Sequence, residues 1–269
     1  MKRVTQLTGA VLLAVGLVSA AKAGTIDLTT VGASSTLANG VILSETDIQP
    51  TGTGVIDPFL RLQNTPSEAG INTTLDTPNV PILDDKPGLW THDQPLSGPN
   101  GLTQINIGGT LYYKFLLDIN QTASSPLLNL NAIKFYVRSS AFNTLNSFAN
   151  FFNLKTDNHG ALVPNGALPA PTFDVLGGNN VLLNYSLNHG SGSGDMFMFV
   201  PVSALGTSGF LYLYNQNGAP PGINASNDGF EEWAGALGTN VPVPDASTTL
   251  MLLGMVFVGV EGLRRKLSA

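Results

Sequence analysis

The chain lacks cysteine altogether, and only 11% of its 269 residues are charged. Without thiols it can form no disulfide, no thiolate nucleophile, no cysteine-ligated zinc site and no iron–sulfur cluster. Its three histidines, His92, His159 and His189, are far apart in sequence, and none belongs to a His-Glu-x-x-His zinc motif. Stability must therefore come from a buried core, backbone hydrogen bonds or bound ions.

The sequence has 30 glycines and 17 prolines, and 43% of its residues are hydrophobic. Short apolar runs separated by turn residues are typical of β-strands. Residues 133–138 alternate as a half-buried strand does, with Ile133, Phe135 and Val137 on one face and Lys134 and Arg138 on the other. Further strands are expected at residues 25–29, 41–44, 59–63, 110–119, 173–175, 181–185, 196–200 and 210–214. Only residues 141–154 have the spacing of a helix, with Phe142, Leu145, Phe148 and Phe152 recurring every three or four positions. The fold class predicted for residues 24–238 is all-β, a single antiparallel β-sandwich with jelly-roll-like connections.

The first 23 residues have the order of a secretory signal peptide. Lys2 and Arg3 precede an apolar run over residues 9–21, and Ala21, Lys22 and Ala23 supply the small-x-small site. The run is too short for a spanning helix, which needs about 20 apolar residues. We therefore expect signal peptidase to cut after Ala23. A retained N-terminal anchor is the alternative.

The other end has three parts in a fixed order. Residues 239–249 form a Pro-containing linker with Val243, Pro244, Asp245 and Ala246; an apolar run covers residues 250–260; and Arg264, Arg265 and Lys266 precede the chain end. The apolar part of residues 250–269 predicts a membrane helix, and the basic cluster predicts a cytoplasmic end. The alternative is a buried C-terminal helix, which does not explain the three cations that follow at once.

This three-part tail resembles the PEP-CTERM class of bacterial sorting signals. Asp245 stands where Glu is usual in that class and Ala246 where Pro is usual, so the tail is closer to the Val-Pro-Asp variants. The resemblance implies processing by an exosortase-type membrane enzyme in a Gram-negative-type bacterium that makes exopolysaccharide. It covers about the last 27 residues, and it implies an exported protein that is anchored in the membrane or located at the cell surface.

Removing both targeting segments takes away six of the 12 basic residues but only two of the 18 acidic ones. The remaining body is therefore strongly acidic, which argues against nucleic acid as a partner and favours cations. Calcium can stabilise oxygen-rich loops in such a domain. The predicted ligands are Asp118, Asn120, Asp195, Asp228 and Glu231, with Glu232 as an alternative to Glu231. Simple Asx turns at strand ends are the competing explanation for each of them.

Catalytic motifs are missing from the sequence. The segment 189–195 contains His, Ser and Asp, but its glycine spacing is that of a flexible loop and not of a nucleophile elbow or a phosphate loop. Glu231 and Glu232 beside Trp233 suggest a sugar site, yet neighbours on a strand point to opposite faces. A glycosidase needs a partner carboxylate, for which Asp84, Asp85, Asp93 and Asp195 are candidates.

Three central stretches, residues 115–121, 190–196 and 227–234, resemble a module of other PEP-CTERM proteins, and this resemblance implies no activity. We expect a non-enzymatic structural or adhesive surface protein associated with exopolysaccharide or biofilm. The alternative is a carbohydrate-binding module or glycan-active hydrolase. Exposed rings of Tyr212, Tyr214, Trp233 or Trp90 favour sugar binding, and buried rings favour a plain core.

Overall fold

The structure is a computed structural model, and it describes residues 24–46, 57–75, 81–190, 192–219 and 223–235. Most of the regular structure is β-strand, arranged in two seven-stranded sheets and one two-stranded sheet. This confirms the prediction of an all-β, mainly antiparallel body. The signal peptide, the linker and the C-terminal helix that the sequence predicts lie outside the described residues.

The first sheet has the strand order β1-β13-β9-β15-β5, with β12 beside β9 and β6 beside β15. All pairings in this sheet are antiparallel except that of β1 with β13, which is parallel. Its strands are β1 (Thr25–Asp27), β5 (Glu68–Ile71), β6 (Gln94–Pro95), β9 (Leu127–Arg138), β12 (Phe173–Asp174), β13 (Asn180–Asn184) and β15 (Phe210–Asn217).

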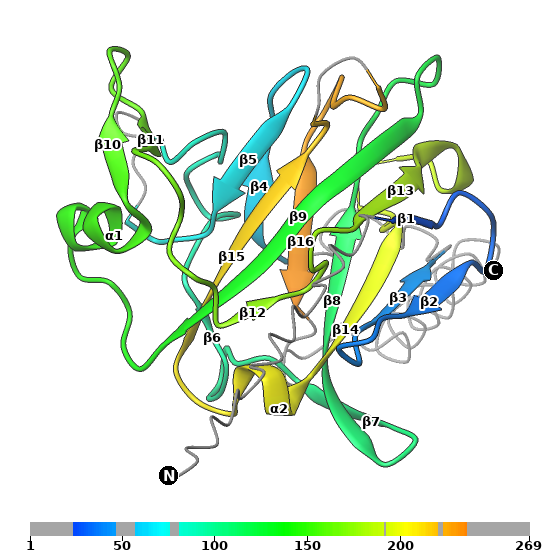
Figure 1. The fold of residues 1–269 in the computed structure, drawn as a ribbon, viewed down its shortest axis with the longest axis horizontal. Coiled ribbons are helices and arrows are strands. Elements are labelled where there is room, and N and C mark those ends of the chain that lie inside the picture. Colours follow the sequence, from blue (N-terminus) through cyan, green and yellow to red (C-terminus); the bar gives the residue numbers. More distant parts are fainter. Residues whose placement is uncertain (1–23, 47–56, 76–80, 191, 220–222, 236–269) are drawn as a thin grey trace, which may run out of the picture.

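The second sheet has the order β2-β3-β14-β8-β16-β4, with β7 beside β8, and every pairing in it is antiparallel. Its strands are β2 (Ser34–Thr36), β3 (Ile42–Glu45), β4 (Pro58–Leu62), β7 (Gln104–Ile107), β8 (Thr110–Asp118), β14 (Met196–Pro201) and β16 (Glu231–Gly235). The long strands β8 and β9 lie in different sheets, and the hairpin of β7 and β8 projects at one end (Figure 1).

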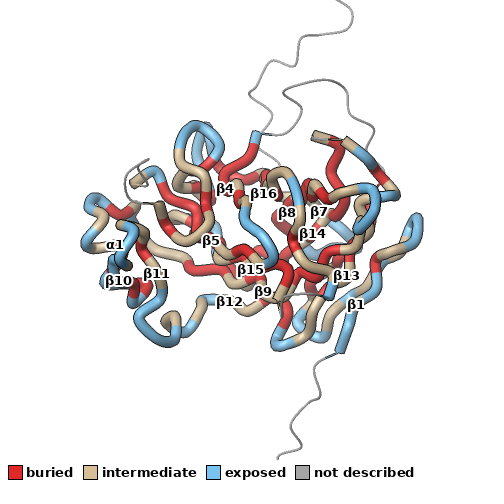
Figure 2. The backbone as a smooth tube through the Cα atoms, turned by 90° about the horizontal axis from the view of Figure 1, so that it is seen from above, coloured by how far each residue is buried: buried red, intermediate tan, exposed pale blue. Residues whose placement is uncertain are grey.

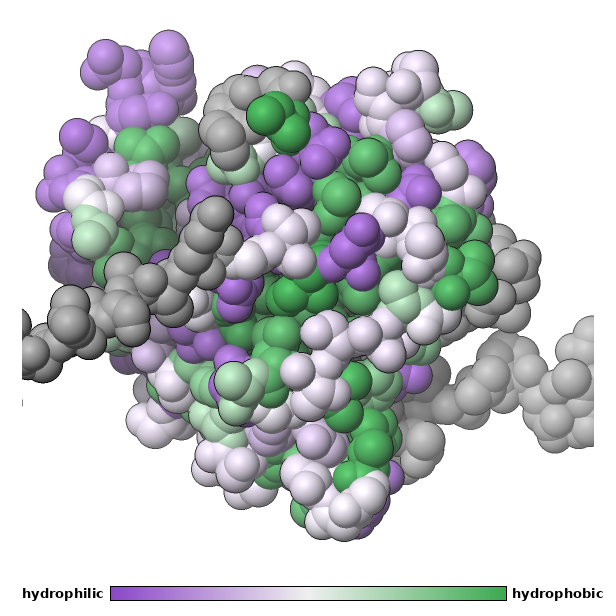
Figure 3. Space-filling view, turned by 45° about the vertical axis from the view of Figure 1, so that its right-hand side comes forward, coloured by the Kyte–Doolittle hydropathy of each residue, from purple (hydrophilic) through white to green (hydrophobic). Residues whose placement is uncertain are grey.

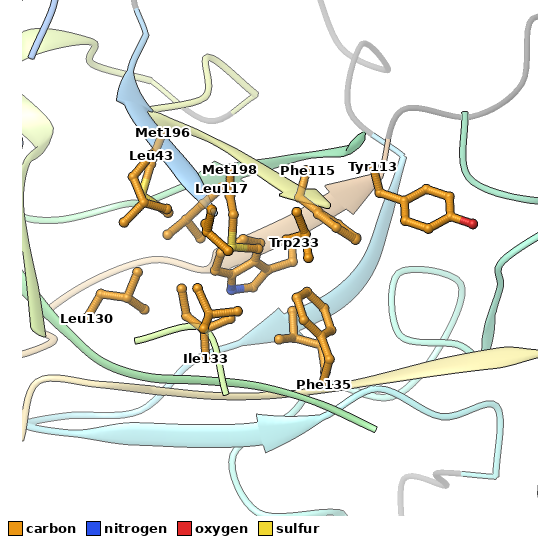
Figure 4. Close-up of a cluster of buried hydrophobic side chains, with 14 of the residues drawn as sticks. Leu43, Tyr113, Phe115, Leu117, Leu130, Ile133, Phe135, Met196, Met198 and Trp233 are labelled. Atoms are coloured by element: carbon orange, nitrogen blue, oxygen red, sulfur yellow. The ribbon is translucent and has the colours of Figure 1, made fainter. Parts of the chain in front are cut away.

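The main core lies between the two sheets. Alternating residues of β8 and β14 point into it, as do residues of β9 and β15 from the other sheet. Trp233 has no exposed surface and lies at the centre of this cluster among Phe115, Leu117 and Ile133 (Figure 4). Seen from above, the buried segments concentrate in the middle strands of both layers, and exposed segments lie in the peripheral loops (Figure 2).

A second, smaller core covers part of the first sheet. It contains α1 (Leu145–Phe152) and the hairpin of β10 (Leu154–Thr156) and β11 (Leu162–Pro164), packed on Tyr136 and Tyr212. The predicted helix therefore exists but is shorter than residues 141–154. Thr144 caps its start by accepting a hydrogen bond from the Ser147 N–H (3.2 Å), and Asn153 ends it in the left-handed conformation (φ 52°).

The remaining helical elements are single turns, α2 (Val202–Leu205) and the 3₁₀-helix η1 (Tyr185–Leu187). None of the helices among the described residues has both the length and the apolar character required to cross a membrane.

Candidate functional site

The predicted site residues Asp118 and Asp195 meet where β8 ends and β14 begins. The carboxylate of Asp118 accepts hydrogen bonds from the backbone N–H groups of Gly192 (2.6 Å) and Gly194 (3.2 Å). In return, Asp195 Oδ2 accepts one from the N–H of Ile119 (2.8 Å). Both glycines have positive φ, at 84° and 73°, which lets their N–H groups turn towards the carboxylate. The glycine-rich segment is thus a structural loop tied to the sheet by two acids.

The carboxyl groups of Asp118 and Glu45 are close enough to Asp195 to affect its protonation. Burial first, and then the nearby charges of Asp118 and Glu45, raise the pKa of Asp195 to about 8, while the hydrogen bond from Ile119 acts in the opposite direction. Burial also raises the pKa of Asp118, while its bonds to the glycine loop act in the opposite direction. Glu45 Oε2 accepts a hydrogen bond from the Gly32 N–H (2.6 Å). Glu45 Oε1 and Asp195 Oδ1 are buried and have no hydrogen-bond donor.

The other predicted calcium ligands are distributed over different places. Asp228 Oδ1 accepts a hydrogen bond from the Gly229 N–H (2.9 Å), which is a local turn contact. Asn120 packs against Gly229. Glu231 is fully buried. Its neighbour Glu232 lies opposite Asp118 in the strand register. Because successive side chains of a strand point to opposite faces, Glu231 lies on the other side of the sheet from Asp118.

Across the described ranges, no three His, Cys, Asp or Glu residues come together in a group that could hold a metal ion. The five predicted ligands therefore do not form one cluster there. Calcium binding at these residues stays a prediction.

Glu231 instead belongs to a polar network buried between the two sheets. Its carboxyl group hydrogen-bonds the carboxyl group of Glu68. The network continues from Glu68 through Asn217 (2.7 Å) and Asn215 (3.0 Å) to the indole N–H of Trp233 (2.8 Å). It joins β5 and β15 of the first sheet to β16 of the second. Glu68, Asn215 and Asn217 were not predicted, because nothing in their local sequence shows that these polar residues point inward.

The aromatic residues considered for sugar binding do not form an exposed row. Tyr212 and Trp233 have no exposed surface, and Tyr214 is partly buried. The Tyr212 hydroxyl accepts a hydrogen bond from the Phe142 N–H (3.1 Å) inside the second core. Trp90 is 39% exposed. By the criterion set from the sequence, the burial of Tyr212 and Trp233 favours a structural core.

The carboxylates Asp84, Asp85 and Asp93, considered for glycoside hydrolysis, accept hydrogen bonds from other groups of the fold. Asp84 accepts hydrogen bonds from the Asn64 side chain (2.6 Å) and the Ala69 N–H (2.9 Å). Asp85 accepts one from the Ile82 N–H (2.9 Å), and Asp93 accepts one from the Thr74 hydroxyl (2.8 Å). Asp85 holds a local turn, whereas Asp84 and Asp93 connect segments that are 15 to 20 residues apart in the chain.

Two surface hollows are lined by described residues. One, of about 560 Å³, lies between α1 and the β10–β11 hairpin, and its walls include Leu145, Asn150 and Lys155. The other, of about 380 Å³, is lined by residues near Pro126 and Asn224. Neither is lined by the carboxylates considered for catalysis. Figure 3 shows that hydrophilic side chains gather on the projecting end of the β10–β11 hairpin, at the upper left.

The comparisons with known proteins concern the tail, which lies outside the described residues. No curated protein and no solved structure matches the chain. A family model named VPDSG-CTERM motif matches residues 242–267. The corresponding residues here are Val243, Pro244, Asp245, Ala246 and Ser247, so the first three positions are shared with the name of the motif. The match confirms that the chain carries a PEP-CTERM-like sorting signal of the Val-Pro-Asp variant, the mark of an exported protein handled by an exosortase-like system.

Proposed function

We propose that this chain is a structural or adhesive protein of the bacterial cell surface, whose tail an exosortase-type membrane enzyme recognises and processes. The sorting motif at residues 242–267 carries this proposal. Signal peptidase removes residues 1–23, the segment 250–260 enters the membrane, and Arg264, Arg265 and Lys266 remain on the cytoplasmic side. The host is a Gram-negative-type bacterium, and extracellular polysaccharide is the expected surrounding.

The described body supports a role without catalysis. We interpret it as one jelly-roll-like β-sandwich domain whose polar residues serve its own fold. Asp118 and Asp195 hold the glycine loop, and Asp84 and Asp93 connect segments that are distant in the chain. The rival proposal of a sugar-binding or sugar-cleaving domain loses its main support, because the Trp233 ring lies in the core.

The proposal is tested by following the protein through the cell. The full-length chain and a variant that lacks residues 242–267 are expressed in a host with the exosortase-type enzyme and in the same host without it. We expect the full-length chain at the cell surface, with a shortened tail, only when the enzyme is present. The variant is expected to pass into the periplasm or medium without this processing.

Two outcomes contradict the proposal. One is a full-length chain that stays in the cytoplasm with residues 1–23 attached. The other is identical processing and location of both chains whether or not the enzyme is present. A variant in which Arg264, Arg265 and Lys266 are all replaced by Gln keeps the apolar run and tests the basic cluster separately.

A further inference from the structure

Two glutamates meet in the interior from opposite sheets. Glu68 begins β5 of the first sheet and Glu231 begins β16 of the second, and they are 2% and 0% exposed. Their carboxyl groups are hydrogen-bonded to each other. Two ionised carboxylates in direct contact repel each other, and burial adds the cost of removing both charges from water. The contact is favourable only if one of the two carries a proton.

The hydrogen bonds around the pair leave one of its four carboxyl oxygens without a donor. Glu68 Oε1 accepts from the Asn217 side chain (2.7 Å), and Glu68 Oε2 accepts from the Asn64 N–H (3.2 Å). Glu231 Oε1 accepts from the Gln121 side chain (2.8 Å). Glu231 Oε2 is buried and has no donor. A proton on this oxygen turns it into the donor of the bond to Glu68, so that all four oxygens are satisfied.

The surroundings of the pair favour its protonated form. Burial raises the pKa of Glu231 well above its usual range, and the Glu68 charge raises it further. Burial also raises the pKa of Glu68, and Asp84 contributes in the same direction. Arg61 of β4 is in register with Glu232, so it lies on the opposite side of the sheet from Glu231. The groups that contact the pair from β15 and the β8–β9 connection are neutral: the side-chain amides of Asn217 and Gln121 and the backbone N–H of Asn120.

We propose that Glu68 and Glu231 share one proton, and that this shared proton holds the two sheets together at one end, so that this end opens as the surroundings become alkaline. The pair is connected through Asn217 and Asn215 to Trp233 in the main core. Loss of the proton places two negative charges face to face between the layers. The strands β5 and β16 separate at the ends that carry Glu68 and Glu231, while the rest of each sheet keeps its hydrogen bonds.

The direction of the effect follows from linkage. A carboxyl group whose pKa is raised in the folded state binds its proton more tightly there than in the open state. Closure is therefore most favourable in acid and weakens as pH rises from about 4.3 towards the folded-state pKa of the pair. The equilibrium constant for opening rises at most about tenfold per pH unit over this interval.

Hydrogen exchange of the full-length chain in a chelating buffer, followed by mass spectrometry at pH 6, 7, 8 and 9, tests the proposal. Rates are corrected for the intrinsic pH dependence of exchange. We expect the protection of β5 and β16 to fall with pH more steeply than that of β13. Glu231→Gln keeps a donor for Glu68 and an acceptor for Gln121, so its β5 and β16 protection is expected to change little with pH.

Glu232→Gln is the matched control, because it makes the same change one residue away on the other face of the strand. It should retain the pH dependence of the natural chain at β5. Glu68→Gln is a second variant, and like Glu231→Gln it should flatten the profile. Protection in the natural chain that does not change with pH overturns the proposal. So does a calcium addition that restores protection at pH 9, because an ion and not a proton then joins the carboxylates.

Discussion

Replacing Asp195 by asparagine tests the electrostatics of the loop that leads into β14 and is hydrogen-bonded to the end of β8. Asp195 is 4% exposed, and its pKa is raised to about 8 by burial first and by the Asp118 and Glu45 charges next. An unfolded aspartate has a pKa near 3.9. The folded protein therefore holds this proton more tightly than the unfolded chain does. The contribution of Asp195 to stability is complete below about pH 4 and is lost progressively as pH rises to 8.

The size of this loss follows from the shift in pKa. A difference of about four pH units corresponds to roughly 5 kcal/mol at 1.36 kcal/mol per unit. That is comparable with the whole unfolding free energy of many domains, about 5–15 kcal/mol. Asparagine keeps the acceptor for the Ile119 N–H and removes the charge. Asp195→Asn should therefore match the natural protein near pH 4 and exceed its stability by several kcal/mol at pH 8.

Urea denaturation at pH 4, 6 and 8, followed by tryptophan fluorescence, measures this difference. Asp57→Asn makes the same chemical change at an exposed position. The unfolding free energy of this variant should depend on pH in the same way as that of the natural protein. If the unfolding free energies of the natural protein and of Asp195→Asn change in parallel from pH 4 to 8, the argument that Asp195 is neutral in the folded state is wrong.

Three further substitutions have outcomes fixed by the structure. Gly194→Ala should destabilise the protein by about 1–3 kcal/mol more than Gly192→Ala. Both glycines have positive φ, but only a Cβ at position 194 meets a side chain, that of Leu116 in β8, at 2.6 Å. Equal thermal midpoints of the two variants would contradict this. Trp233→Phe should destabilise the protein by at least about 1–3 kcal/mol, because the side-chain carbonyl of Asn215 loses its donor. A double-mutant cycle with Asn215→Ala, measured by urea titration, should show that the two residues are coupled. Thr144→Ala removes the cap of α1 and should cost about 1 kcal/mol, measured by the same titrations; no loss would mean that the cap bond is not formed in solution.

The sequence predicts best the strands that have long apolar runs. Thr110–Asp118, Met196–Pro201 and Phe210–Asn217 are found close to their expected bounds, because their apolar runs are long. β9 extends from Leu127 and is longer than predicted, since Asn129 and Asn131 interrupt its pattern. Short edge strands such as β2, β6 and β7 were missed, because two to four residues carry too little periodicity to be recognised.

The buried polar groups could be predicted only in part. The sequence predicts Asp118 and Asp195 as calcium ligands, and the structure places these two residues together without testing the calcium. The partner of Glu231 was not predicted, because Glu68 is 163 positions away and only the packing of two sheets brings them into contact. Sequence patterns report the period of one strand, and they do not report which residue of another sheet faces it.

The most direct test of the central claim is the intact mass of the protein recovered from the cell surface of a host that has the exosortase-type enzyme. The account predicts a chain that begins at Gly24 and has been cut within or near the motif at residues 242–267. A surface protein with the mass of the uncut chain from Met1 to Ala269 would contradict it.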